Sequence, residues 1–387
     1  MEQIFRGTAA GPAPKGGNRQ AHSAKLCKKS RSAKWPALLR PWLLALLCLL
    51  PAGASVATGR GGGAADEPRR FSVLQWNVWQ EGTMVKGGYE AIVDEIVRLR
   101  PDFVTLSEVR NYHGRDFIRR LRQSLAERGE TYYGFSSYDS GLLSRHPLED
   151  SLTVFPCRDD HGSIYRLTAR LGNRKVAVYT AHLDYLNCAY YDVRGYDGST
   201  WQKTAIPTSA EAVLERNDRS LRDEALTAFL AQAARDSAAG CAVILGGDFN
   251  EPSHRDWTEQ TAGNFDHHGL VIAWPATSRL EAAGFGDAWR TLHPDPVKAP
   301  GITFPADNPD VAVNRLTWTP DADERERIDF LFYRGEGLSP VRCALFGPAG
   351  TICRSRRTPL LTGEDLIRPL GTYPSDHMGL YCEFELR

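Results

Sequence analysis

The chain has 387 residues, and 42% of them are hydrophobic, which is enough to bury a sizeable core in one large domain or two smaller ones. Lysine plus arginine equals aspartate plus glutamate at 47 each, but residues 1–57 contain nine basic residues and only one acidic residue. Residues 58–387 therefore contain 38 basic and 46 acidic residues, and their formal charge of −8 excludes a general attraction to polyanionic nucleic acid. A local basic groove remains compatible with this charge.

The first 57 residues have the pattern of an export signal. A long basic stretch precedes the apolar run 42–50, and the small residues at 52–54 and 55–57 resemble signal-peptidase sites. Because nine apolar residues are too few to span a bilayer comfortably, we expect a cleaved signal peptide and no stable membrane span. The protein is then periplasmic or extracellular, with a retained signal anchor as the alternative. The Gly- and charge-rich residues 58–70 are expected to form a flexible linker.

Six cysteines follow this leader, namely Cys157, Cys188, Cys241, Cys343, Cys353 and Cys382. An even number in an oxidising compartment permits disulfides. The turn-rich residues 346–350 lie between Cys343 and Cys353, so these two are expected to pair. The sequence contains no CxxC motif or Cys/His cluster that would indicate a zinc site.

The folded domain is expected to occupy residues 71–387 as one unit without an internal repeat. Strands are predicted, in chain order, over residues 71–79, 102–106, 131–138, 141–143, 163–171, 175–182, 241–246, 327–332, 341–346 and 378–385. Helices are predicted over residues 91–100, 116–128 and 209–234, and a polar insert over about 184–207. Because neighbouring strands often lack a helix between them, the pattern predicts mixed sheets covered by helices, an α+β fold of the α/β sandwich kind.

Polar residues cluster at the ends of these predicted strands, where active sites are usually built on loops held by a rigid scaffold. The candidates are Asn77, Glu108, His182, Asp248, Asn250, Asp329, Asp376 and His377. Each has an ordinary alternative when taken alone: Asn77 as a turn residue, Glu108 as a solvated carboxylate and His182 as a structural histidine.

The segment Gly246–Asn250 carries a stronger signal. Its two glycines let the backbone turn tightly or approach a ligand closely. Asp248 and Asn250 are two residues apart, so they project in the same direction from an extended chain. Such a pair can orient a water molecule and bind a phosphoryl oxygen, whereas the alternative is a plain Asx turn.

Asp329 lies inside an apolar strand, and a buried carboxylate needs a partner. Asp376 and His377 precede the last strand and offer a second carboxylate and an imidazole. We expect Asp329 to orient His377, because a carboxylate holds the ring's tautomer and stabilises its charged form. Hard oxygen ligands of this kind suit Mg²⁺, Mn²⁺ or Ca²⁺, and the whole inventory fits attack of activated water on phosphorus.

In this order the motifs resemble the endonuclease/exonuclease/phosphatase superfamily, which includes deoxyribonuclease I, abasic-site endonucleases, inositol 5-phosphatases and bacterial sphingomyelinases. The matching segments are QWNVW (75–79), SEV (107–109), LLSRHP (142–147), YTAHLD (179–184), GGDFN (246–250), RIDFLF (327–332) and SDH (375–377). The resemblance implies a four-layer sandwich in which two mixed β-sheets pack face to face and helices cover both outer faces. It places the site at one edge, between the sheets.

The resemblance also implies a divalent-metal site. In it Glu108 is the principal metal ligand, Asn77 lies beside it, and Asp376 completes or supports the site. Members of the superfamily differ in using one metal or two.

For the remaining residues the resemblance implies catalytic roles. Asp248 orients or deprotonates the attacking water, while Asn250 and His182 hold the phosphoryl oxygens. His377, paired with Asp329, donates a hydrogen bond to the phosphate or assists proton transfer.

Fold membership does not choose the substrate. The first hypothesis is a phosphatase or phosphodiesterase that acts, as a monomer, on a small or lipid-linked phosphoester. The second is an exported nuclease, so nucleic acid is a possible but less favoured partner. The third is a non-catalytic phosphate- or glycan-binding module, against which the intact motifs argue.

Three further segments bear on substrate choice. The Tyr-rich insert 185–201 follows His182 and is expected to overhang the site, either to stack on a ring or to pack on the domain as a lid. Residues 250–257 are typical of a capped helix start, with His254 and Arg255 as candidates for a second phosphate. The basic cluster Arg354, Arg356 and Arg357 has a solvated loop as its alternative.

Overall fold

The computed structural model describes residues 68–360 and 363–387. The expected signal peptide at 1–57 and residues 58–67 of the expected linker lie outside the described residues. Strand β1 (Arg69–Asn77) begins two residues before the predicted start of the domain. Within the described ranges no helix is both long and apolar enough to cross a membrane.

The described residues form two mixed sheets of six strands each. The first sheet has the order β13-β10-β14-β1-β2-β3, and β1 pairs parallel with β2 and antiparallel with β14. Its other strands are β2 (Phe103–Val109), β3 (Asp139–Ser144), β10 (Leu338–Phe346), β13 (Leu366–Ile367) and β14 (Gly379–Leu386).

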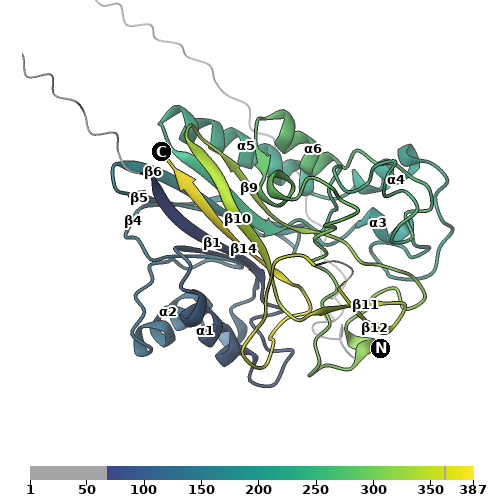
Figure 1. Cartoon of the computed structure of the whole chain (residues 1–387), viewed down its shortest axis with the longest axis horizontal. Helices are drawn as coiled ribbons and strands as arrows, with labels where there is room; N and C mark the ends of the chain where they lie inside the picture. Colours follow the sequence, from purple (N-terminus) through teal and green to yellow (C-terminus); the bar gives the residue numbers. More distant parts are fainter. Residues whose placement is uncertain (1–67, 361–362) are drawn as a thin grey trace, which may run out of the picture. The chain divides into compact units, whose positions relative to one another are not determined.

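The second sheet has the order β4-β5-β6-β7-β9-β8, in which β7 runs parallel to β6 and antiparallel to β9. Its strands are β4 (Leu148–Phe155), β5 (Gly162–Leu171), β6 (Arg174–Leu183), β7 (Ala242–Asp248), β8 (Gly286–Asp287) and β9 (Asp329–Arg334). A separate hairpin is formed by β11 (Gly350–Cys353) and β12 (Arg356–Pro359), which is visible at the lower right of Figure 1.

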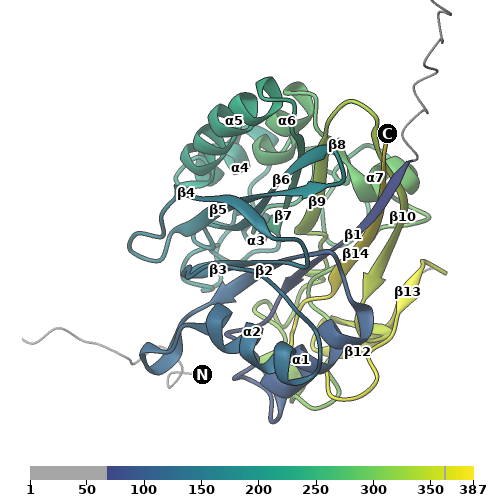
Figure 2. The same cartoon turned by 90° about the vertical axis from the view of Figure 1, so that its left-hand side faces the viewer.

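Helices cover both outer faces, so the fold has the four layers that the resemblance implied (Figure 2). The helices are α1 (Gly88–Leu99), α2 (Phe117–Glu127), α3 (Ala189–Asp192), α4 (Ala210–Asn217), α5 (Arg222–Ala238), α6 (Pro275–Ala282) and α7 (Ala288–Leu292), with short 3-10 turns at Tyr112–Gly114 and Val313–Arg315. Helices α1 and α2 lie outside the first sheet, and α5 and α6 lie outside the second (Figure 2). The predicted fold class, an α/β sandwich with two mixed sheets face to face, is confirmed.

The arrangement of the core explains why the sequences of the central strands are almost continuously apolar. On β6, Val176 and Val178 pack between the two sheets, whereas Ala177 and Tyr179 pack against the helix layer formed by α5 and α6. Successive side chains of a strand point to opposite faces, so a strand covered on both sides must be apolar at every position. Such burial on two faces makes the sandwich a rigid support for the polar strand ends.

Two predicted elements differ from the structure. The helix predicted over 209–234 is two helices, α4 and α5, because the chain turns at 218–221 and the backbone N–H of Leu221 donates to the Asp184 carboxylate. The strand predicted over 131–138 is only an isolated bridge between Tyr133 and Ser144.

The predicted pairing of Cys343 with Cys353 is wrong, because Cys343 is bonded to Cys382. These two cysteines face each other directly in the antiparallel pair β10–β14, and their Cα atoms are 4.1 Å apart. Cys353 ends β11 in the separate hairpin. The turn-rich segment after Cys343 leads the chain into that hairpin, so Cys343 and Cys353 are close in sequence but belong to different sheets.

Candidate active site

Strand register gathers the candidate residues at one edge of the sandwich. His182 on β6 pairs with Asp248 on β7, and Asp248 pairs in turn with Asp329 at the start of β9. On the facing sheet Asn77 ends β1, and Glu108 lies next to the end of the parallel strand β2. Strands that end at the same edge thus place residues distant in sequence into one site.

Asn77 connects the two sheets. Its amide nitrogen donates to Glu108 Oε1 at 3.1 Å and to Asp248 Oδ2 at 2.9 Å, while its amide oxygen accepts from the backbone N–H of Trp79. Glu108 Oε2 accepts from the backbone N–H of Gln80 at 2.9 Å. In this arrangement Asn77 orients two carboxylates from opposite sheets, one of them the expected metal ligand.

The position of Glu108 depends on an irregularity in β2. The register with β3 shifts between Ser107 and Val109, and Glu108 has a φ of 65°. A β-bulge re-aims a side chain at the end of a strand, and a left-handed non-glycine residue is costly enough to be retained for a reason. The bulge turns the carboxylate toward Asn77, and nothing in the apolar pattern of the strand indicated it.

His377 is held by a chain of buried hydrogen bonds. Its Nδ1 lies 2.9 Å from Asp329 Oδ2, the pairing that the sequence led us to expect. Asp329 Oδ1 accepts from Gln75 Nε2 at 3.1 Å, and Gln75 Oε1 accepts from the Thr105 hydroxyl at 2.7 Å. Both oxygens of the buried carboxylate are therefore satisfied, and the ring is fixed with its Nε2 free to face the site.

His182 has a matching partner that sequence reasoning missed. Its Nδ1 lies 2.8 Å from Asp139 Oδ1, and Asp139 also accepts from the hydroxyl of Ser163 at 3.2 Å. Asp139 opens β3 with a φ of 70°, three residues before the start of the LLSRHP segment. It falls between the strands predicted over 131–138 and 141–143, so no pattern singled it out, and only the pairing of the strands brings it to His182.

The two imidazoles converge on one carboxylate. His182 Nε2 and His377 Nε2 lie 3.9 Å and 3.8 Å from Asp248 Oδ2, and the side chains of His182, His377 and Asp248 are only 4%, 7% and 1% exposed. Asp248 Oδ1 accepts from the backbone N–H of Asn250 at 2.9 Å. The Asn250 amide donates to the carbonyl of Leu183, which keeps its side chain beside the end of β6.

Burial and neighbouring charges set the protonation of this group. Burial by itself lowers the pKa of each histidine, but Asp139 raises the pKa of His182 to about 9, and Asp329 and Asp248 raise that of His377 to about 10. Burial and the nearby Asp329 charge raise the pKa of Asp248 to about 6. At neutral pH the site therefore presents two imidazolium donors around a carboxylate.

A divalent cation fits the other side of the site. Asp376 is 6% exposed, and its Oδ1 has no hydrogen-bond partner among the described residues. Burial, together with the neighbouring Glu108 charge, raises the pKa of Asp376 to about 7. Asp376, with its unused oxygen, and the half-buried Glu108, whose charge acts on it, are a donor set suited to a hard cation such as Mg²⁺.

The Tyr-rich insert packs on the domain rather than opening its rings to the site. Tyr190, Tyr191 and Tyr196 are buried in an apolar cluster with Trp257. The fully buried guanidinium of Arg222 donates to the backbone carbonyls of Asp184, Leu186 and Asn187 and so holds the first residues of the insert. Of the two interpretations of this segment, these contacts favour the packed lid.

The other candidates for a second phosphate are engaged in ion pairs. His254 and Arg255 both contact Glu281, and residues 250–257 form turns rather than the expected helix start. In the basic cluster, Arg354 pairs with Asp266 and Arg357 with Asp307. Each of these groups has a structural role that the sequence alone left open.

Comparison with known proteins connects the site to a family. The model of the family described as "Endonuclease/Exonuclease/phosphatase family" matches residues 74–377. "Uncharacterized protein F14F9.5" of Caenorhabditis elegans is 28% identical over 318 residues, which cover 81% of this chain and 90% of that protein.

The chain is also similar to solved structures, among them the following two. One is D. rerio TDP2 complexed with single strand DNA product, with 18% identity, a TM-score of 0.46 and coverage of 81% of this chain and 98% of that chain. The other is the human Nocturnin catalytic domain with bound sulfate anion, with 17% identity, a TM-score of 0.45 and coverage of 81% and 94%.

Proposed function

The chain belongs to the endonuclease/exonuclease/phosphatase family of metal-dependent phosphoester hydrolases, and on this premise we propose that it cleaves a small or lipid-linked phosphoester with Mg²⁺. The observation that supports the proposal is the pair of carboxylate-bound imidazoles, His182 with Asp139 and His377 with Asp329, both directed at Asp248. That geometry suits the binding of one phosphoryl group and the activation of one water molecule.

In the proposed reaction the protein's own groups bind the phosphate and handle the proton. The Nε2 atoms of His182 and His377 and the amide of Asn250 donate to phosphoryl oxygens, and these bonds strengthen as negative charge develops on phosphorus. Asp248 orients the attacking water and accepts its proton. A cation held by Glu108 and Asp376 supplies Lewis-acid stabilisation of the same charge when it is bound.

The charge of the body supports a small substrate over a polynucleotide. Residues 58–387 have a formal charge of −8, and three of the candidate cations outside the site, Arg255, Arg354 and Arg357, are paired with acids. A protein that binds nucleic acid strongly needs several cations free for phosphates. The export pattern of residues 1–57 supports action outside the cytoplasm, and we propose a monomer.

Hydrolysis by residues 58–387 tests the proposal. The assay uses a chromogenic phosphodiester and plasmid DNA, each with Mg²⁺, Mn²⁺, Ca²⁺ or EDTA. Metal-dependent cleavage of the small ester without nicking of DNA is expected. Nicking that EDTA and Asp248→Asn both abolish would replace the proposal with a nuclease, and failure on both substrates would overturn this substrate class.

A further inference from the structure

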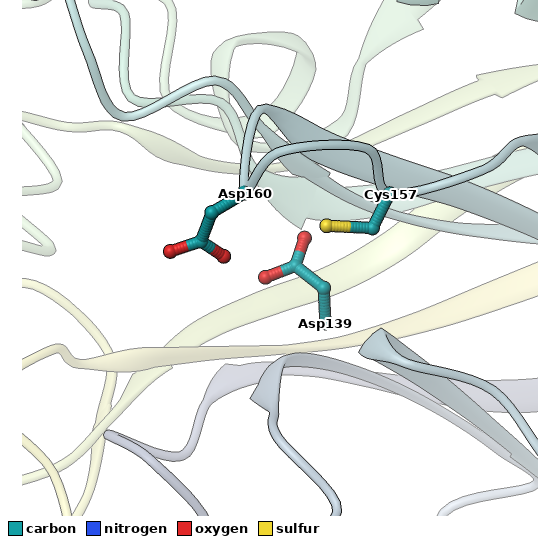
Figure 3. A group of neighbouring side chains, drawn as sticks. All are labelled: Asp139, Cys157 and Asp160. Carbon is teal, nitrogen blue, oxygen red and sulfur yellow. The ribbon is translucent and has the colours of Figure 1, made fainter. Parts of the chain in front are cut away.

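A second group of polar side chains lies beside the site, on the far side of His182. The carboxyl groups of Asp139 and Asp160 and the thiol of Cys157 point toward one another in Figure 3, and their ligand atoms lie within 4.8 Å of each other. Asp139 is buried, whereas the side chain of Asp160 is 44% exposed. The group therefore extends from the catalytic histidine to the solvent.

The guanidinium of Arg110 neutralises this group, so it does not resemble a metal site. Arg110 Nη1 lies 3.1 Å from Asp139 Oδ1 and also donates to Asp160 Oδ1. Asp139 is already bonded to His182 and Ser163. Burial raises the pKa of the Cys157 thiol to about 12, so the sulfur stays protonated and is a poor metal ligand.

Arg110 is well placed to meet a substrate. It follows β2 two residues after Glu108, and its charge acts on both Glu108 and His182. Its side chain is 15% exposed and contacts both the buried Asp139 and the exposed Asp160. Through Asp139 the guanidinium lies one carboxylate away from the imidazole that faces the phosphate. Its Nη1 is engaged by the two carboxylates, and a guanidinium released from Asp160 suits a second phosphate bound bidentately.

From this arrangement we propose that Asp160 is a specificity-determining residue, whose carboxylate occupies Arg110 and so excludes substrates that carry a second phosphate next to the scissile one. The inference rests on the proposed function and specifies its substrate class as esters with a single phosphoryl group. The charges of protonated His182, Arg110, Asp139 and Asp160 sum to zero. Removal of the Asp160 carboxylate leaves one positive charge on the remaining residues.

Asp160→Asn tests the proposal with little strain, because asparagine tolerates the φ of 65° at this position. The substrates are a chromogenic nitrophenyl phosphodiester of a nucleoside, with and without an additional phosphate on the other sugar hydroxyl. We expect the ratio of kcat/KM for the phosphorylated to the plain ester to rise about fivefold or more, as for a gained charge-assisted hydrogen bond. The gain should shrink as ionic strength rises.

Two further variants separate this role from a structural one. Arg110→Gln combined with Asp160→Asn should abolish the gain, because the cation that binds the second phosphate is then absent. Asp365→Asn, which removes an exposed carboxylate paired with Arg342 on the first sheet, should leave the ratio unchanged. An unchanged or lower ratio in Asp160→Asn, or the same gain without Arg110, would overturn the inference.

A binding measurement keeps this inference separate from the proposed function. Calorimetry without added metal compares inorganic pyrophosphate with inorganic phosphate on the unmodified protein and on Asp160→Asn. Preferential tightening of pyrophosphate in the variant is expected even if neither ester is hydrolysed. Equal affinities in both proteins would reject the role of Asp160, whereas absent hydrolysis with the expected binding would reject only the substrate class proposed above.

Discussion

The two histidine–carboxylate pairs of the site have the same local geometry and different surroundings. Both pairs are buried, and in the pair of His377 the second oxygen of Asp329 accepts from Gln75. In the pair of His182, by contrast, Asp139 also faces Arg110, which leads toward solvent. The comparison shows that the same buried motif can serve only to fix a ring, as with Gln75 behind it, or can also connect the ring to substrate selection when its second partner is the partly exposed Arg110.

The largest expected effect comes from the carboxylate that both pairs face. Asp248→Asn keeps the shape of the side chain but removes the group that orients and deprotonates water, so we expect kcat to fall about a thousandfold or more. Because burial raises the pKa of Asp248, the folded protein does not depend on its charge, and the thermal midpoint should not fall. Steady-state kinetics and a melting curve measure both, and near-normal turnover would remove Asp248 from the reaction.

The next two variants remove the carboxylate of each histidine pair in turn and compare the effects on kcat. Asp329→Asn is expected to lower kcat about a hundredfold or more, because an amide can hold His377 in the wrong tautomer and no longer stabilises its charge. Asp139→Asn should lower kcat only about tenfold, since asparagine keeps the left-handed backbone and still accepts from Arg110 or Ser163. Equal losses in the two variants would show that the second partners, Gln75 and Arg110, do not distinguish the pairs.

The smallest expected effect concerns the residue behind the buried pair. Gln75→Ala removes a donor to Asp329 and an acceptor for Thr105. Leaving these buried groups unpaired should lower the free energy of unfolding by about 1–3 kcal/mol and kcat severalfold. Denaturant unfolding and kinetics test this, with Thr105→Val as the control that spares Asp329. A loss of stability without any change in kcat would limit Gln75 to a role in folding.

The sequence by itself determined the fold class, the strands that carry the site and the pairing of Asp329 with His377. The physical reason is that apolar periodicity reports burial directly, and a carboxylate inside an apolar strand must find a partner. Where this signal was strong, at Asp329, the expected partner His377 lies 2.9 Å away in the structure.

Some contacts have no local signal in the sequence, and only the tertiary structure showed which residues form them. Asp139 carried no signal in the sequence, and β3 brings it to His182. Glu108 reaches Asn77 through a β-bulge that the apolar pattern did not indicate. Cys343 forms its disulfide with Cys382 because the pairing of β10 with β14 places these two residues opposite each other. Contacts across sheets depend on register and on the direction of the chain after each turn, which single-sequence periodicity does not encode.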